Sequence, residues 1–285
     1  MDVSNRSMLY SIVVILTPTR EATVRATMGH QAHAAFLRTV EDADPALAEV
    51  LHLPNLPARP FTVSPLLGVG RAHDGRIRLS PQQDYFLRFT VLYPPIFERF
   101  IARFLHGTGR PIIRLGRACL LIKEIIVTPE SHPWAGYTSW AQLAGDALPD
   151  PEIALDFITP VAFSFGQKEW GKKIVVLPEP TLVFGSLARS WNNLSPPSLQ
   201  VDRKALMTYV GEHVVVKRLR GLETQMLRFR HSPQVGFVGQ VKYGLMADNE
   251  PARCQLNALA GFAFYAGVGM KTTQGMGQVR RPPDQ

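Results

Sequence analysis

The sequence predicts an α+β protein made of two tandem domains, each with the β-α-β-β-α-β element order of the ferredoxin-like (RRM-like) fold. Three observations lead to this prediction. Segments rich in β-branched residues alternate with segments whose apolar residues recur at helical spacing. This order occurs twice in 285 residues, more loosely the second time. Prolines and turn residues fill the segment between the two halves. We therefore expect domains at 1–129 and 152–285, joined by a linker at 130–151.

The first half begins with a strand at 8–16, which is rich in β-branched residues and ends at Pro18. A helix follows from about residue 29, because Ala32, Phe36 and Val40 recur at helical spacing. The remaining helices of this half are a short one capped by Asp44 and ending at His52, and one from Pro94 that stops at Gly107. Its remaining strands lie at about 60–70, 76–92, which Pro81 interrupts, and 111–128.

The second half has the same kinds of element with an insertion. Its expected strands lie at about 152–163, 212–220, 222–230, 235–244 and 276–281. Its expected helices lie at about 180–191, 202–211 and 251–266. A glycine-rich loop precedes the last strand.

Composition indicates a folded, basic protein. Hydrophobic residues make up 46% and charged residues 19%, which excludes a disordered chain. The net charge of +8 favours a polyanionic partner, nucleic acid or a membrane surface, although a basic surface without a partner remains an alternative. The apolar run at 8–16 is far shorter than the ~20 residues that span a bilayer. With only Cys119 and Cys254 and no disulfide framework, we expect a cytoplasmic protein without a membrane segment.

The loop at 267–277 is the strongest local feature. Its glycines permit positive φ, and such a loop can direct several N–H groups at one phosphate. It is not a P-loop, because no glycine directly precedes Lys271 and a strand is expected to follow. A flexible connector is the alternative. The residues expected to contact phosphate here are Gly267, Gly269, Lys271, Thr272, Thr273, Gly275 and Gly277.

Arginines on the expected strands form a second feature. Arg228 and Arg230 alternate, which predicts that both project from one face of their strand. Arg218 and Arg220 precede them on the neighbouring strand, and paired arginines on an open sheet suit a phosphate backbone. A solvated outer face is the alternative for this stripe.

Histidines are the candidates for proton transfer, because their ordinary pKa lies near neutrality. His52 ends a short helix close to Arg59. His30 and His33 are one helical turn apart, which would also suit a metal pair, but no third ligand stands at helical spacing. We therefore expect neither a metal nor a cofactor. No nucleophile motif of a serine or cysteine hydrolase occurs.

Several motifs, taken in order along the chain, resemble one family, the CRISPR repeat-processing endoribonucleases of the Cas6 family in the RAMP superfamily. The glycine loop at 267–277 matches the signature of that family in full. The other matching stretches are Phe61-Thr62-Val63-Ser64-Pro65-Leu66, His132-Pro133-Trp134-Ala135-Gly136, Phe157-Ile158-Thr159-Pro160, Leu182-Val183-Phe184-Gly185-Ser186-Leu187 and Gly236-Phe237-Val238-Gly239.

This resemblance implies two ferredoxin-like folds that bind RNA and cleave it without a metal, within each CRISPR repeat of a precursor transcript. The 2′-hydroxyl before the cut would attack the adjacent phosphorus, leaving a 2′,3′-cyclic phosphate and a 5′-hydroxyl. His52 takes the position of the main acid/base, His30 that of its partner, and His33 is the reserve. Leu37 occupies the position of a tyrosine and Arg59 that of a lysine in some members, so Arg59 is expected to stabilise phosphate.

The resemblance also implies the partners. Lys271 and the loop amides would hold the RNA backbone, and the strand arginines would grip a hairpin stem. The substrate is CRISPR repeat RNA, hairpin or single-stranded, and a CRISPR effector complex or a homodimer is compatible with the sequence. An alternative function is a non-catalytic subunit that retains guide RNA in an effector complex. A nucleotide-binding metabolic enzyme is disfavoured by the missing P-loop and the basic charge.

Overall fold

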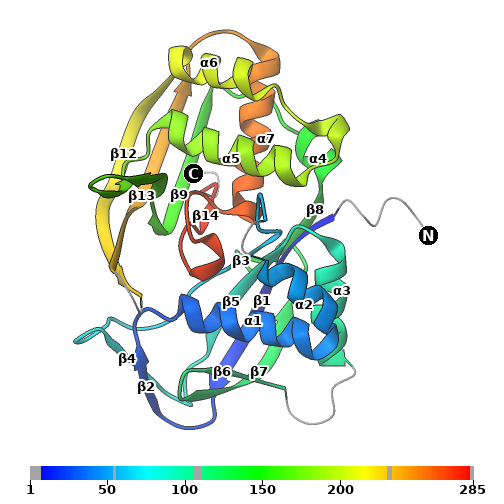
Figure 1. Ribbon diagram of the computed structural model, residues 1–285, viewed down its shortest axis with the longest axis vertical. Helices are drawn as coiled ribbons and strands as arrows, with labels where there is room; N and C mark the ends of the chain where they lie inside the picture. Colours follow the sequence, from blue (N-terminus) through cyan, green and yellow to red (C-terminus); the bar gives the residue numbers. More distant parts are fainter. Residues whose placement is uncertain (1–7, 54–55, 106–110, 230–232, 283–285) are drawn as a thin grey trace. The chain divides into compact units, whose positions relative to one another are not determined.

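The computed structural model describes residues 8–53, 56–105, 111–229 and 233–282, and Figure 1 shows its elements. Helices and antiparallel strands are both abundant, so the predicted α+β class is confirmed. The chain divides into two compact units. The first comprises residues up to Thr138 together with Thr273–Gly275, and the second comprises Ser139–Thr272 together with residues from Met276 onward.

The main sheet of the first unit has the strand order β3-β5-β1-β7-β6, and β8 also pairs with β1. A separate two-stranded sheet consists of β2 and β4. The strands are β1 Met8–Pro18, β2 Ala22–Arg25, β3 Phe61–Val63, β4 Arg76–Leu79, β5 Tyr85–Val91, β6 Ile112–Leu115, β7 Ala118–Ile126 and β8 Gly136–Ser139. The helices are α1 Gly29–Ala43, α2 Pro45–His52 and α3 Pro94–Leu105.

Aromatic packing holds α1 against the sheet of this unit. The buried ring of Phe36 lies 4.8 Å from Phe61, 5.2 Å from Phe89 and 5.5 Å from Phe100, measured between ring centroids. Such pairs add to the free energy gained by burying apolar surface. Asp44 separates α1 from α2, because its Oδ1 accepts a hydrogen bond from the Leu47 amide at 3.0 Å. The predicted cap is therefore confirmed, and it fixes where α2 begins and delivers His52 at its end.

The second unit has a four-stranded sheet of order β12-β13-β9-β14 and a separate hairpin of β10 and β11. Its strands are β9 Glu152–Val161, β10 Phe163–Lys168, β11 Gly171–Val175, β12 Val214–Arg228, β13 Pro233–Leu245 and β14 Val279–Arg280. Its helices are α4 Trp140–Gly145, α5 Pro180–Leu194, α6 Arg203–His213 and α7 Glu250–Ala266. Short 3₁₀ turns occur at Pro197–Leu199 and Thr272–Gln274.

Both main sheets share one topology. In each unit the first and third of four core strands lie side by side at the centre, β1 next to β5 and β9 next to β13. The fourth core strand, β7 or β14, pairs with the first, and the second, β3 or β12, pairs with the third. This is the strand order of a β-α-β-β-α-β unit, so the predicted ferredoxin-like topology is present twice.

Element boundaries differ from the predictions wherever a turn was hidden by an apolar run. The expected interruption of the 76–92 strand at Pro81 is observed, since it forms β4 and β5. The single strand expected at 111–128 is two strands, and Gly116, with φ of 60°, makes the turn between them. Conversely, the strands expected at 212–220 and 222–230 form the continuous strand β12, which passes a register shift near Gly221. Residues 130–151, expected as a linker, contain β8 and α4.

Candidate functional site

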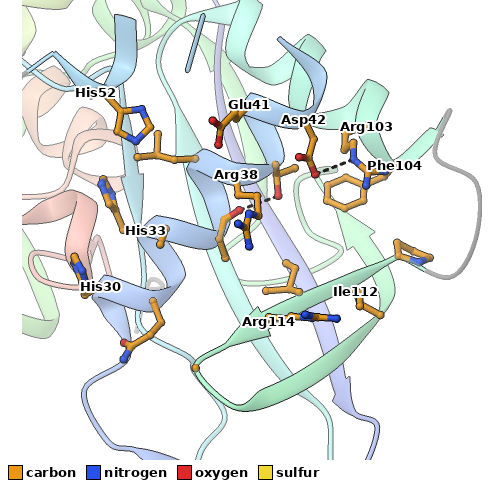
Figure 2. A pocket seen from close by; sticks show the side chains of 18 residues that line it. His30, His33, Arg38, Glu41, Asp42, His52, Arg103, Phe104, Ile112 and Arg114 are labelled. Atoms are coloured by element: carbon orange, nitrogen blue, oxygen red, sulfur yellow. Dashed lines mark hydrogen bonds and ion pairs between the residues drawn. The ribbon is translucent and has the colours of Figure 1, made fainter. Parts of the chain in front are cut away.

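A groove of about 820 Å³ lies in the first unit, lined by α1, α3, the end of α2 and the β6–β7 hairpin. Figure 2 shows His30, His33 and His52 together along one side of it. Farther along the groove are the charged side chains of Arg38, Glu41, Asp42, Arg103 and Arg114. The three histidines predicted to transfer protons are therefore brought to one site by two different helices.

Helical periodicity explains why two of these histidines face the groove. His30 and His33 lie in the first turns of α1, one turn apart, and therefore project from the same side of the helix. His52 is the last residue of α2, and its side chain is exposed. The charges of His30 and His52 both act on His33 and lower its pKa, which indicates that the three rings are close enough to interact.

His52 is held in one tautomer by its own helix. Its Nδ1 lies 2.8 Å from the Ala48 carbonyl oxygen, one turn earlier in α2. A carbonyl oxygen accepts hydrogen bonds but does not donate them, so Nδ1 carries the proton. In the neutral ring, Nε2 then carries the lone pair and can accept a proton. Local helix geometry thus leaves a base on the exposed side of the ring.

His33 is electrostatically different from its neighbours. The pKa of its ring is lowered from 6.5 to about 4, mainly by burial and also by the charges of His30, Arg59 and His52, although a hydrogen bond with the Thr273 backbone raises it. Its ring also stacks on Phe61 at 5.8 Å between centroids. His33 is therefore neutral near pH 7, and it cannot serve as a protonated acid there.

Arg59 fastens the end of α2. Its Nη1 donates a hydrogen bond to the Leu51 carbonyl at 2.6 Å, directly before His52. Helix ends leave carbonyl groups without helical partners, and a cation there is favourable. Arg59 is not among the residues that line the groove, but its charge reaches His33. Its observed contact is thus with the protein backbone beside the candidate base.

Most amides of the glycine loop, which were predicted to be directed at a phosphate, are already bonded within the protein. Their acceptors are carbonyl or hydroxyl oxygens. These bonds run from Gly267 to Ala263, Val268 to Gly277, Gly269 to Ser186, Met270 to Ala162, Gly275 to Val63, Met276 to Lys271 and Gly277 to Pro160. A donor that is already bonded has nothing to offer a ligand.

The loop glycines are instead required by close packing of backbone. A Cβ on Gly267 would lie 2.8 Å from the Gly277 oxygen, and one on Gly269 would lie 2.5 Å from the Ala162 oxygen. A Cβ on Gly277 would overlap the Val268 oxygen, and φ at this position is 74°. The tip of the loop also packs on the start of α1, where a Cβ on Gly29 would overlap the Gln274 oxygen.

Lys271 is the charged group of the loop. Its φ is 57°, an uncommon value for a residue with a side chain. Its Nζ lies 4.2 Å from the centroid of the Phe229 ring, a cation–π contact. Burial and, less strongly, the charge of Lys172 lower the pKa of Lys271. Thr272 is half-buried and Thr273 is buried, and both belong to the 3₁₀ turn that follows.

The predicted arginine stripe lies on β12, an edge strand of the second unit. Arg218, Arg220 and Arg228 are all exposed, and Arg230 lies outside the described residues. Beside this stripe, Lys217 and Lys242 both pair with Glu152, at 2.6 Å and 2.7 Å. These hydrogen bonds lower the pKa of Glu152 to about 2. Glu152 is thus already neutralised by two lysines, whereas Glu223 lies on β12 itself.

Sequence reasoning missed the charged side chains farther along the groove. Arg38 and Glu41 follow the histidines on α1, and Arg114 comes from β6. The helical spacing of Glu41 could have indicated it, because it stands eleven residues, about three helical turns, after His30 and therefore on the same face of α1. No local pattern indicates Arg114, since its place depends on how the β6–β7 hairpin packs beside α1. Asp42 is paired with Arg103 at 3.4 Å.

The described residues contain neither a cluster of metal ligands nor a membrane-spanning helix. Within that part of the chain, no group of three or more His, Cys, Asp or Glu side chains is arranged to hold a metal ion. None of the helices seen there has the length and apolar character needed to cross a membrane.

Comparison with known proteins identifies the family. The model for the CRISPR Cas6 N-terminal domain matches residues 8–145, and the model for CRISPR-associated endoribonuclease Cas6 matches residues 155–279. The chain belongs to the Cas6 family. A CRISPR-associated endoribonuclease Cas6 from Streptococcus thermophilus is 28% identical over 128 residues, which are 45% of this chain and 49% of that protein. This match therefore spans about half the length of that relative.

Solved Cas6 structures resemble the chain over almost its whole length. A Cas6 product complex is 28% identical, covers 97% of this chain and 100% of its own, and has a TM-score of 0.79. A Thermus thermophilus Cas6 is 27% identical, covers 97% of this chain and 99% of its own, and has a TM-score of 0.70. The predicted architecture of two tandem ferredoxin-like domains is confirmed by these matches and by the repeated strand order.

Proposed function

We propose that this Cas6 family protein is a metal-independent endoribonuclease that cleaves CRISPR precursor RNA within its repeats. The observation that carries the proposal is the exposed His52 ring beside His30 and His33, with its Nδ1 bonded to Ala48 and its Nε2 left as a base. The family supports the substrate class, because its model and its Streptococcus thermophilus member are named as CRISPR-associated endoribonucleases.

The chemistry requires two proton transfers and no external nucleophile. His52 Nε2 accepts the proton of the 2′-hydroxyl, whose oxygen forms a bond to the adjacent phosphorus. The bond from phosphorus to the 5′-oxygen breaks, and a protonated imidazole supplies a proton to that oxygen. The products are a 2′,3′-cyclic phosphate and a 5′-hydroxyl. Because the nucleophile belongs to the RNA, no metal is needed to generate it.

The three histidines take different roles in this proposal. His30 is exposed and supplies the proton to the leaving oxygen. His33 has a pKa of about 4 and stays neutral at pH 7, and its ring packs on Phe61 beside the other two histidines. Arg59 holds the end of α2 through Leu51 and adds positive charge near the phosphorane as a positioning residue. His33 is therefore not the acid in this proposal.

The remaining predicted contacts are with the RNA backbone. Lys271, Arg218, Arg220 and Arg228 contribute charge that attracts phosphates, and Thr272 adds a hydroxyl at the surface. The glycines contribute by shaping the loop that presents Lys271, since their own amides are bonded within the protein.

The decisive experiment is His52→Ala, measured as single-turnover cleavage of the cognate repeat RNA. The rate should fall by about 10²- to 10⁴-fold while the RNA dissociation constant stays within about twofold. His213→Ala, at the end of α6 in the other unit, is the matched control and should cleave normally. An unchanged rate for His52→Ala would remove this residue from the mechanism. A wild-type protein that binds repeats without cutting them would favour the non-catalytic subunit.

The reaction path has its own test. A 2′-deoxy substitution at the nucleotide before the cut should abolish cleavage, and excess EDTA should leave wild-type cleavage unchanged. Cleavage of the deoxy substrate, or a strict magnesium requirement, would contradict the proposed path while leaving the assignment of substrate intact.

A further inference from the structure

The ribbon formed by β2 and β4 has one apolar and one basic face. The antiparallel register places Val24 opposite Ile77, and both are buried. The alternate positions face solvent, because side chains alternate along a strand. These exposed residues are Thr23, Arg25, Arg76 and Arg78. Three of the four solvent-facing side chains on the ribbon are therefore arginines.

Two of these arginines oppose each other directly. Arg25 pairs with Arg76 across the strands, so their Cβ atoms are about 4.5–5.5 Å apart. Like charges in this position destabilise a sheet. Arg78 differs, because Glu21 pairs with it at 2.5 Å. Among the described residues, no carboxylate forms an ion pair with Arg25 or Arg76.

A tight turn holds Arg76 in place despite this repulsion. Asp74 and Gly75 have φ of 49° and 69°, and His73 and Arg76 exchange two backbone hydrogen bonds of 2.9 Å. The Asp74 carboxylate is 3.3 Å from the His73 ring. The Ala26 amide donates to the Gly75 oxygen at 2.8 Å, which ties the end of β2 to the same turn. The guanidinium pair therefore stands on a rigid support.

The ribbon adjoins the catalytic end of α1. Arg25 ends β2, and α1 begins at Gly29, immediately before His30 (Figure 1). Five residue steps separate Arg25 from His30, so their Cα atoms are at most about 18 Å apart. A strand of RNA bound at the histidines is thus a few nucleotides from the ribbon.

We propose that Arg25 and Arg76 form a second phosphate-binding site, which takes the backbone of the RNA outside the cleaved junction. A phosphate between the two guanidinium groups would accept paired hydrogen bonds and remove their mutual repulsion. The identity of the ligand as RNA rests on the proposed function, whereas the site itself rests on the register and the charges. The ribbon would extend the RNA contacts of the first unit beyond the groove.

The test is the double variant Arg25→Gln/Arg76→Gln, with RNA affinity measured against salt concentration. Its affinity for a full repeat should fall about tenfold, and the slope of log K against log salt should decrease by about 0.7–0.9, as for one lost phosphate contact. Arg78→Gln is the matched control on the same face. Because Glu21 already neutralises this arginine, its affinity should stay within about twofold.

A short RNA that covers only the cut junction separates this site from the groove. The double variant and the wild-type protein should bind it equally, because it does not reach the ribbon. Equal affinities for the full repeat, or an equal loss in Arg78→Gln, would overturn the proposal. So would a double variant that loses binding to anionic vesicles but keeps its affinity for RNA. If wild-type protein fails to cleave repeats yet the double variant still binds them more weakly, the proposed function fails and the ribbon site stands.

Discussion

The glycine loop and the histidine end of the groove differ in what their polar groups are bonded to. In the loop, the amides of Gly267, Gly269, Gly275 and Gly277 all donate to acceptors within the protein. At the histidine end, the hydrogen bond from His52 Nδ1 to Ala48 leaves the other ring nitrogen exposed. The glycine loop is the more conspicuous of the two in the sequence, but its glycine amides are already bonded, whereas the histidine end leaves a ring nitrogen for a ligand.

This difference shows how a structural role can be distinguished from a chemical one. A buried donor must be satisfied, so a loop that packs its backbone tightly uses its amides internally. A side chain at a helix end can satisfy one atom locally and present another to solvent. The loop therefore acts as a scaffold for Lys271 and for the Thr273 backbone beside His33.

Among the variants that test this difference, Gly277→Ala should have the largest effect, a loss of folding stability. The new Cβ would overlap the Val268 oxygen, and φ is 74°, so the free energy of unfolding should fall by about 3 kcal/mol or more. Urea unfolding measures this change. Gly116→Ala has a similar φ of 60° but open space around its Cβ, and should lose only about 1 kcal/mol. A stable Gly277→Ala with weakened RNA binding would instead make the loop a ligand site.

The second largest effect should be on the pH dependence of stability, because His33 is neutral in the folded protein. Its folded pKa is about 4, whereas in the unfolded chain it is about 6.5. Between these values the unfolded chain binds a proton that folded His33 does not, so stability rises with pH across this window. The free energy of unfolding is therefore about 2–3 kcal/mol lower at pH 4.5 than above pH 6.5.

His33→Gln isolates this contribution. The variant should lose about 2–3 kcal/mol less than the wild-type protein when urea unfolding is repeated at pH 7 and then at pH 4.5. His213→Gln, at the end of α6 in the second unit, is a suitable control for removal of an imidazole. Equal pH dependence in the His33 variant and the wild-type protein would mean that His33 is not buried in its neutral form, and would restore it as a candidate acid.

The smallest effect should come from Lys271, the charged group that the loop presents. Lys271→Gln should weaken RNA binding about two- to fivefold and reduce the salt slope by about 0.7–0.9, as for one phosphate contact. Phe229→Leu removes the ring that the ammonium contacts but keeps the charge, so the salt slope should not change. A Lys271→Gln variant with unaltered affinity and slope would make the contact with Phe229 the whole role of this lysine.

Much of the architecture was predictable because it follows local rules. Apolar spacing predicted α1, and the Asp44-Pro45 pair predicted where α2 starts. Turns inside apolar runs were missed, as at Gly116, because a glycine within a strand pattern also fits a bulge. At Gly221 the reverse occurred: a bulge within β12 was taken for a break between strands.

The candidate site was predictable by residue type but not by role. His30, His33 and His52 were singled out, and the structure places all three on one groove. Their distinction into a base, a partner and a neutral ring depends on contacts with Ala48, Phe61 and Thr273. The ribbon arginines carried no sequence signal, because the opposition of Arg25 and Arg76 exists only in the strand register.

By itself, the sequence determined the repeated β-α-β-β-α-β order, the basic charge and the family signature at 267–277, since these depend on neighbouring residues and on composition. Only the tertiary structure decided which donors are bonded internally, which histidine is neutral and which arginines oppose each other. Hydrogen bonding, burial and charge are properties of groups close in space, and Thr273 reaches His33 from the opposite end of the chain.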